Sequence, residues 1–396
     1  MSDFEGLPEP DVDVGSIDPE TLRERIDSGE ELTVLDVRVE SEFEEWHIDG
    51  ENVAIDNLPY YEFIEGVDDD LLDRVPEGDP LIVVCAKGGA SNYVAGLLVE
   101  EGRDAINLAD GMNGWATIYD AVEVTRADGP DTVIQYQRPS SGCLGYLVVD
   151  GGEAAVVDPL RAFTDRYAED AADEGADLTY AIDTHIHADH VSGVRNLIEE
   201  GVEGVMPAPA ADRGMTYADA VTTVGDGDEL ALGDTTIEAV HTPGHTTDMT
   251  SYRVGNVLFT GDGLFTESVA RPDLEEGDEG APDAAAQLYD TFHERILTLS
   301  DDLVVAPAHF SDAATPAEDR TYTARLGDLE DRMKALHLDR DEFVEFILAD
   351  MPPRPGNFEE IIATNLGQQD VSDDEAFTLE LGPNNCAATR EAMTGD

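Results

Sequence analysis

DTHIHADH, residues 183–190, closes an apolar run of the chain and leads into Val-Ser-Gly. Its three imidazoles and the carboxylate of Asp189 cannot all be buried cheaply without a metal ion or strong hydrogen bonds. His185 and His187 are two residues apart, so their side chains share one face if the backbone is extended. Asp189 and His190 can then turn inward where the chain enters a helix. The segment therefore predicts a metal site at the end of a strand.

Further potential ligands recur at the ends of other predicted strands. They are His245 in HTPGHTTD, Asp262 in FTGDGLF and His309 in VAPAHF. A glycine beside each of the first two allows the backbone to approach a site closely. Six of the nine histidines fall in the ligand-bearing segments, so scattered hydrogen-bonded histidines are a poor alternative explanation. We interpret His241 as a structural or supporting residue rather than a ligand.

The length and the rhythm of apolar runs predict two α/β domains. At 396 residues the chain is long for a single core. From residue 15 to 125, short apolar runs alternate with helical patterns, which is typical of a parallel sheet. From residue 130 to 396, hairpin-like and alternating elements mix, which predicts a layered α/β sandwich, with a helical extension from Pro316 onward. Residues 1–14 are predicted to form an acidic disordered arm, and Arg126–Asp131 a linker.

A second candidate site lies in the first predicted domain. Cys85 ends a predicted strand and begins the loop CAKGGA, residues 85–90, before a helix that we expect to open at Ser91. Backbone N–H groups of such a loop point inward, and the helix N-terminus adds positive potential. Both effects favour a thiolate that can hold a persulfide. A buried cysteine that merely ends a core strand remains the alternative.

The charge of the chain is extreme. Asp and Glu total 89 against 22 Lys and Arg, which gives a formal net charge of -67. The acidic residues are spread along the whole chain, so we interpret them as adaptation to high salt rather than as one acidic partner surface. No basic stripe is present to meet phosphates, which argues against nucleic acid as a partner.

Several features predict a cytoplasmic protein that does not bind a membrane. The first residues, MSDFEGLPEPDVDVG, show neither the basic nor the apolar region of a signal peptide. No apolar run approaches the roughly 20 residues that span a bilayer. Cys85, Cys143 and Cys386 are odd in number and far apart, which argues against a disulfide framework. The sequence does not fix the oligomeric state, and a homodimer is one possibility.

From about Thr132 to the C-terminus, the ligand motifs resemble the metallo-β-lactamase superfamily, which implies an αββα sandwich. The run GDGLFTESVARPDL, residues 261–274, is similar to the persulfide dioxygenase branch. In that branch an Arg-x-Asp follows the aspartate, here Arg271 and Asp273. The segments ADMPPRP and GPNNCA are also similar to dioxygenases fused to rhodanese domains.

The resemblance implies one Fe(II) per chain, held by His185, His245 and Asp262. Two histidines and one carboxylate on one face of iron leave positions for a persulfide sulfur and O2. The implied reaction converts a low-molecular-weight thiol persulfide to thiol and sulfite. In hydrolase relatives four further residues bind zinc, and here they would support the iron site: His187, Asp189, His190 and His309.

Two alternatives stay open within this resemblance. Arg271 is a candidate for holding the carboxylate of the thiol carrier or an oxyanion, but a salt bridge to Asp273 explains it equally well. The same ligands could also hold two zinc ions about 3.5–4 Å apart, as in a thioester hydrolase of the glyoxalase II type.

Residues from about Gly15 to Val124 resemble a rhodanese-like domain. The matching segments are LDVR at 35–38, EF at 42–43, HI at 47–48 and GMNGW at 111–115. The resemblance implies sulfur transfer through Cys85, from a donor that these residues do not specify. The family loop usually carries arginines where this chain has Ala86 and Ala90, so Cys85 either accepts sulfur only from persulfides or belongs to a docking module.

Overall fold

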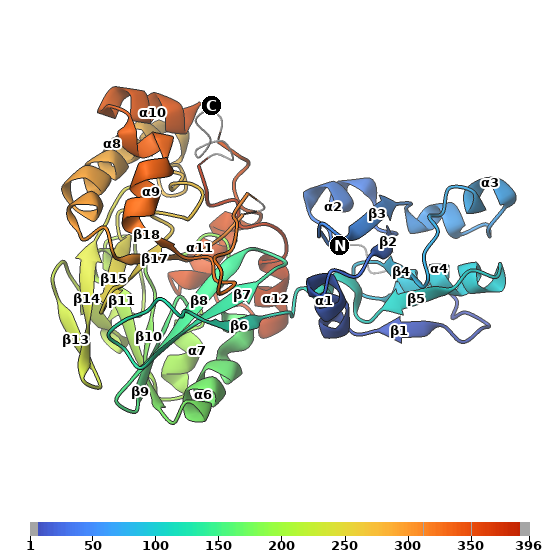
Figure 1. Ribbon diagram of the computed structural model, residues 1–396, viewed down its shortest axis with the longest axis horizontal. Helices are drawn as coiled ribbons and strands as arrows, with labels where there is room; N and C mark the ends of the chain where they lie inside the picture. Colours follow the sequence, from blue (N-terminus) through green and yellow to red (C-terminus); the bar gives the residue numbers. More distant parts are fainter. Residues whose placement is uncertain (1–6, 312, 350, 389–396) are drawn as a thin grey trace. The chain divides into compact units, whose positions relative to one another are not determined.

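The computed structural model describes residues 7–311, 313–349 and 351–388 and divides the chain into two compact units (Figure 1). The first unit contains the residues up to Tyr119 together with Arg138–Ser141 and Leu381–Pro383, and the second contains the remainder. Of the predicted acidic arm, residues 1–6 lie outside the described part of the chain. Residues 7–14 form neither helix nor strand.

The first unit is built on a five-stranded sheet in which every neighbouring pair is parallel. The strands in spatial order are β1 (Gly15–Ile17), β5 (Ala105–Leu108), β4 (Leu81–Val84), β2 (Leu32–Asp36) and β3 (Val53–Asn57). Helices follow the strands along the chain, as the alternating pattern predicts: α1 (Pro19–Asp27), α2 (Glu40–Glu45), α3 (Asp69–Leu72), α4 (Gly89–Glu100) and α5 (Gly111–Trp115).

Both faces of this sheet are buried, which explains the continuous apolar run of β4. Leu81 and Val83 point into a core that they share with α3 and α4. Ile82 and Val84 point into a second core with α1 and α5. A parallel strand covered by helices on both sides has no solvent-facing side, so its sequence does not alternate.

The second unit contains two sheets. The seven-stranded sheet has the order β12 (Thr222–Val224), β11 (Glu203–Pro207), β10 (Asp177–Ile182), β9 (Glu153–Val157), β8 (Cys143–Asp150), β7 (Thr132–Arg138) and β6 (Asp120–Glu123). The six-stranded sheet has the order β13 (Glu229–Leu232), β14 (Thr235–His241), β15 (Thr250–Val254), β16 (Val257–Gly261), β17 (Val304–Pro307) and β18 (Ala324–Arg325).

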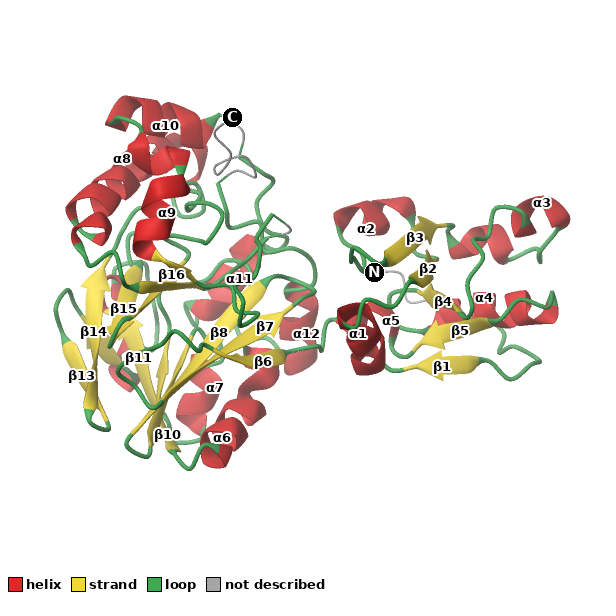
Figure 2. Ribbon diagram, viewed as in Figure 1, coloured by secondary structure: helices red, strands yellow, loops and turns green. Residues whose placement is uncertain are grey.

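The two sheets pack face to face and carry helices on their outer faces (Figure 2). Their shared core includes Tyr146 of β8 and Phe259 of β16, whose ring centroids are 5.0 Å apart. One outer layer contains α6 (Thr164–Asp173) and α7 (Val194–Glu199). The other contains α8 (Gly277–Glu294), α9 (Leu326–Arg332) and α10 (Arg340–Leu348). The predicted αββα sandwich is therefore confirmed.

The segment expected to link the domains has a different role. Arg126–Asp131 connects β6 to β7, and these strands pair antiparallel with Asp120 opposite Gln137. The chain thus joins the second unit before β6. The helical extension is also interrupted at its start, because the short strand β18 precedes α9. Its last two helices are α11 (Phe358–Asn365) and α12 (Asp373–Leu379).

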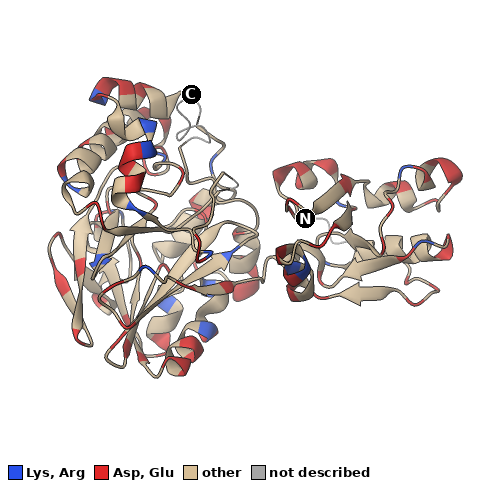
Figure 3. Ribbon diagram, in the orientation of Figure 1, with Lys and Arg blue, Asp and Glu red and all other residues tan. Residues whose placement is uncertain are grey.

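Acidic residues are distributed over the helices and loops of both units (Figure 3). Within the part of the chain that is described, no helix is both long enough and apolar enough to cross a bilayer.

Candidate functional site

The predicted ligands of the second unit come together where four strands end. His185 follows β10, His245 follows β14, Asp262 follows β16 and His309 follows β17. Gly261 allows this convergence, since a Cβ atom there would lie 2.4 Å from Oγ1 of Thr184, and its φ of +50° suits glycine. The strand ends therefore bring ligand side chains from distant parts of the sequence into one buried cluster.

His185, His245 and Asp262 form the centre of this cluster. Oδ2 of Asp262 lies 3.7 Å from Nε2 of His185 and 3.6 Å from Nε2 of His245. Among the described residues, none of these three buried atoms has a hydrogen-bond partner. Leaving such atoms unpaired is costly. Ligands about 2.1 Å from one metal ion lie roughly 3.0–3.6 Å apart. The two distances lie at and 0.1 Å beyond the upper end of this range, so a slight inward movement of the side chains lets this set hold a metal ion.

The two histidines of this central set are prepared as neutral ligands. Nδ1 of His245 donates to the carbonyl of Arg271 at 2.8 Å, and Nδ1 of His185 lies 3.0 Å from the hydroxyl of Thr184. Such contacts fix the ring and leave Nε2 for the metal. Burial lowers the pKa of both imidazoles, and for His185 the neighbouring His187 lowers it further.

Asp189, His190 and His309 make a second set whose members contact one another, while Oδ1 of Asp189 and Nε2 of His190 have no hydrogen-bond partner among the described residues. Nε2 of His309 lies 2.6 Å from Oδ2 of Asp189, while its Nδ1 bonds Oδ1 of Asp262. Nδ1 of His190 lies 3.4 Å from the same oxygen of Asp189. Burial by itself lowers the pKa of His309, but the two carboxylates outweigh it and hold that pKa well above the ordinary value.

His187 is drawn away from the central set. Its Nε2 lies 3.0 Å from Asp158 and 4.0 Å from Asp183, and these three residues form a separate group of potential ligands. Asp158 also accepts a 2.7 Å hydrogen bond from the backbone N–H of Thr184. Asp158 belongs to no motif and was not predicted, because its only sequence feature is its place directly after the strand β9.

Two cysteines border the cluster. Sγ of Cys143 lies 3.3 Å from Oδ2 of Asp189, and Cys386 lies close enough to Asp189, Asp262 and His309 to share a metal ion with them. Burial, reinforced by Asp189 and Asp262, raises the pKa of Cys386 well above its ordinary value. Cys143 is buried at the start of β8. The position of Cys386 beside the ligands could not be read from its turn-like segment.

Arg271 does not have the free guanidinium that the anion-binding hypothesis requires. The side chain is 1% exposed. Its N–H groups donate to both oxygens of Asp273 and to the carbonyls of Pro352, Pro353 and Asn385. These five hydrogen bonds use every donor of a guanidinium. The salt-bridge alternative is the one that the structure supports.

The cysteine loop of the first unit is tightly held. Cys85 is buried, and the hydroxyl of Ser91 donates to its Sγ at 3.1 Å. The helix that follows, α4, begins at Gly89, two residues before the predicted start. A Cβ atom on Gly111 would lie 2.0 Å from the carbonyl oxygen of Cys85, which explains the glycine that opens the GMNGW segment. Cys85 thus lies at the carboxyl end of β4, beneath a glycine-rich turn.

Comparisons with known proteins agree with both halves of this architecture. A model of the metallo-beta-lactamase superfamily matches residues 140–309, and one of the rhodanese-like domain matches residues 18–118. The human mitochondrial persulfide dioxygenase ETHE1 is 32% identical over 208 residues, which is 50% of this chain and 76% of the human protein. The chain belongs to the persulfide dioxygenase family. It is an enzyme of the metallo-β-lactamase superfamily with a rhodanese-like domain.

The chain is also similar to hydrolases and to proteins of known structure. Hydroxyacylglutathione hydrolase from Synechococcus sp. is 34% identical over 174 residues, covering 41% of this chain and 63% of that protein. The crystal structure of ETHE1 from Myxococcus xanthus matches with a TM-score of 0.52 and 27% identity, over 59% of this chain and 98% of that one. A metallo-beta-lactamase from Staphylococcus aureus matches with a TM-score of 0.55 and 26% identity, over 61% and 74%.

Proposed function

We propose that this enzyme oxidises a low-molecular-weight thiol persulfide with O2, at one Fe(II) ion held by His185, His245 and Asp262. The balanced reaction is RSSH + O2 + H2O → RSH + SO3²⁻ + 2H⁺. The sulfur–sulfur bond breaks, the outer sulfur is oxidised and O2 is reduced. Membership of the persulfide dioxygenase family supports this assignment.

The observation that carries the proposal is the set of three unpaired buried ligand atoms. Two neutral imidazoles and one carboxylate are the donors of the facial triad that binds non-haem iron. Iron bound there would supply the redox chemistry that Zn(II) lacks. Burial alone would raise the pKa of Asp262, but His309 outweighs it and keeps the carboxylate ionised. The chain therefore presents the charge and the lone pairs that this ion requires.

The second set of residues supports one metal ion rather than two. His309 holds Asp262 on one side and Asp189 on the other. Asp158 holds His187 outside the central set. In this arrangement Oδ2 of Asp189 and both ring nitrogens of His309 contact neighbouring residues of the cluster, and we infer that their role is to orient Asp262 towards the two imidazoles.

The first unit would act on the sulfur before the oxidation step. We propose that Cys85 accepts sulfane sulfur as a persulfide and delivers it to the thiol carrier. The hydroxyl of Ser91 can donate to the sulfur there. Each transfer moves one sulfur atom from a persulfide to a thiolate, so it needs no external oxidant.

A binuclear zinc thioester hydrolase is the second candidate function. Nε2 of His190 and Oδ1 of Asp189 also lack partners among the described residues, and both residues group with His309 and Cys143 as potential ligands. The similarity to hydroxyacylglutathione hydrolases supports the same alternative. Thioester cleavage by a protein with two bound zinc ions would favour it.

The deciding experiment combines metal analysis with oxygen uptake on the full chain, purified at high salt. We expect about one iron per chain and O2 consumption with glutathione persulfide. His185→Ala should lose both, because it removes one of only three ligands. His241→Ala is the matched control, since His241 bonds the carbonyl of Thr247 and not the central set, and it should keep both. A protein with two zinc ions and no O2 uptake would refute the proposal.

A further inference from the structure

Two side chains of the C-terminal extension reach back to the metal loop, which we define as residues 187–192. The carboxamide of Asn365, in α11, donates to the backbone carbonyls of His187 at 3.0 Å and His190 at 2.8 Å. Its oxygen accepts from the backbone N–H of Ser192 at 2.9 Å. Asn365 is 3% exposed, so water does not compete freely for these contacts. One buried side chain thus binds three backbone groups of the loop.

A second residue completes this support. Oε2 of Glu380, which follows α12, accepts from the backbone N–H of Val191 at 3.0 Å, and Glu380 is also 3% exposed. The two side chains therefore satisfy backbone groups at both ends of the loop. Buried backbone groups of an irregular segment need such partners, because no helix or sheet ladder provides them.

The metal loop is connected to the metal ligand Asp262 through the side chains of Asp189 and His309. Asp189 lies within the loop, and its Oδ2 contacts Nε2 of His309 at 2.6 Å. His309 then bonds Oδ1 of Asp262, whose Oδ2 belongs to the central set. A shift of the loop would therefore move or release the residue that orients Asp262.

We propose that Asn365 is a positioning residue that sets the metal affinity of the site, with Glu380 in support. The inference rests on the metal site of the proposed function. Hydrogen-bond partners one layer beyond metal ligands orient those ligands, and their loss weakens metal binding. Here the partner acts on the backbone of the loop rather than on a ligand ring.

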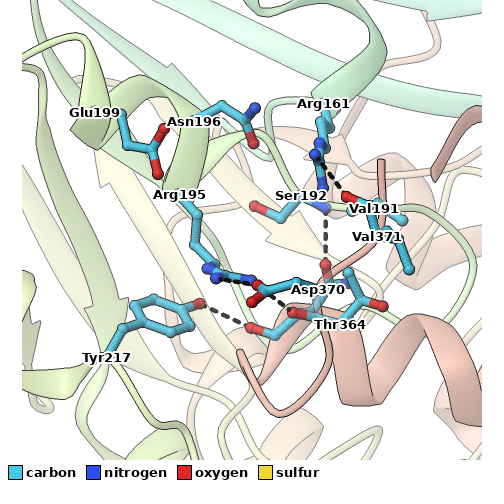
Figure 4. A pocket seen from close by; sticks show the side chains of 11 residues that line it. Arg161, Val191, Ser192, Arg195, Asn196, Glu199, Tyr217, Thr364, Asp370 and Val371 are labelled. Atoms are coloured by element: carbon cyan, nitrogen blue, oxygen red, sulfur yellow. Dashed lines mark hydrogen bonds and ion pairs between the residues drawn. The ribbon is translucent and has the colours of Figure 1, made fainter. Parts of the chain in front are cut away.

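Other contacts attach the extension to the sandwich without touching the metal loop backbone (Figure 4). The hydroxyl of Tyr217 donates to the backbone carbonyl of Asn365 at 2.9 Å, and Arg195 donates to that of Thr364 at 3.3 Å. Arg161 donates to the carbonyl of Val371. Arg195 and Arg161 also donate to the carboxylates of Asp370 and Asp373. None of these attachments uses the side chain of Asn365, which is left to the loop. This separation supplies a matched control.

The test measures metal dissociation constants by chelator competition on the full-length protein. Asn365→Ala should bind Fe(II) about 10–100-fold more weakly than the unaltered protein. It should also change the electron paramagnetic resonance spectrum of the nitric oxide adduct of the iron. Asn365 lines a cavity of about 120 Å³, so water can enter beside the truncated side chain and the fold should persist. Asn365→Ser, which keeps one hydroxyl donor, should show a smaller loss and serves if the alanine variant does not fold.

Tyr217→Phe is the control. It removes one hydrogen bond between the sandwich and the C-terminal extension. It should lower thermal stability and leave the metal dissociation constant unchanged. Unaltered metal affinity in both Asn365 variants, or an equal loss in Tyr217→Phe, would overturn the inference. Repeating the competition with Zn(II) separates this result from the proposed function, because the affinity comparison can be made whichever ion is native and whether or not persulfide is oxidised.

Discussion

At the residue scale, histidines of one motif differ in what their ring nitrogens contact. His185 keeps Nε2 unpaired among the described residues, whereas His187 directs Nε2 to Asp158, 29 residues earlier in the chain. Sequence spacing places both rings at the end of one strand. It could not separate them, because the separation depends on a carboxylate from a different strand. Spacing thus predicted the ligand types, whereas their division into sets followed only from the resemblance to a known family.

Cys85 carries the first residue-scale prediction. Cys85→Ser should abolish thiocyanate release from the sulfur-loaded protein on addition of cyanide, a fall of at least about 100-fold, because a hydroxyl is a far weaker nucleophile than a thiolate at neutral pH. O2 uptake with added glutathione persulfide should stay unchanged, since the metal ligands lie in the other unit. Ser91→Ala should slow thiocyanate release only in part, about 5-fold, by removing one hydrogen bond to the sulfur. Loss of O2 uptake in Cys85→Ser would contradict this division of labour.

At the element scale, Arg271 fastens three segments that are distant in sequence. It bonds Asp273 beside it, the Pro352–Pro353 turn, and Asn385 near the described end of the chain. A lysine has three donors on a single atom and cannot reach acceptors arranged around a planar fork. Arg271→Lys should therefore lower the free energy of unfolding by about 3 kcal/mol, measured by urea denaturation at pH 7. The exposed pair Arg340–Asp290 is the control, and Arg340→Lys should cost less than about 1 kcal/mol.

The same substitution should change the response to acid. Burial alone would raise the pKa of Asp273, but the guanidinium of Arg271 outweighs it, and the pKa lies below the ordinary value. A carboxylate with a lowered pKa in the folded state stabilises the protein above its unfolded pKa of about 3.9, and this contribution disappears as the pH falls through the folded value. The part of the Arg271→Lys deficit that comes from Asp273 should thus disappear on acidification below pH 4, whereas the part that comes from the three backbone carbonyls should remain. A deficit that is constant with pH would contradict this account.

The elements themselves were predictable where local pattern and burial agree. The continuous apolar run of β4 and the loop after it were predicted correctly. A strand that is buried on both faces can be identified from its own apolar residues, without knowing which strands it pairs with. The strand β6 was not recognised, since it is short and its partner β7 follows only after a Gly-Pro turn. Asn365 carries no pattern at all, because its role depends on α11 returning to a loop far earlier in the chain.

At the scale of the whole molecule, the charge is set by composition and not by any one site. Even if each of the 22 basic residues paired with a different acidic residue, most of the 89 acidic residues would have no basic partner. The folded state holds these charges closer together than the unfolded chain does, so repulsion opposes folding at low salt. We therefore propose that the protein is adapted to high salt.

This proposal predicts the sign of the salt effect. The Debye length falls from about 10 Å at 0.1 M to about 3 Å at 1 M, which removes repulsion between surface carboxylates. Attractive pairs are screened as well, but they are far fewer than repulsive ones in a chain with net charge -67. The unfolding temperature should therefore rise by more than about 10 °C between 0.1 M and 3 M KCl. Sucrose also favours compact states but screens no charge, so it should reproduce only a small part of the rise. Equal stabilisation by sucrose and KCl would mean that screening is not the cause, and a flat response to KCl would remove the case for salt adaptation.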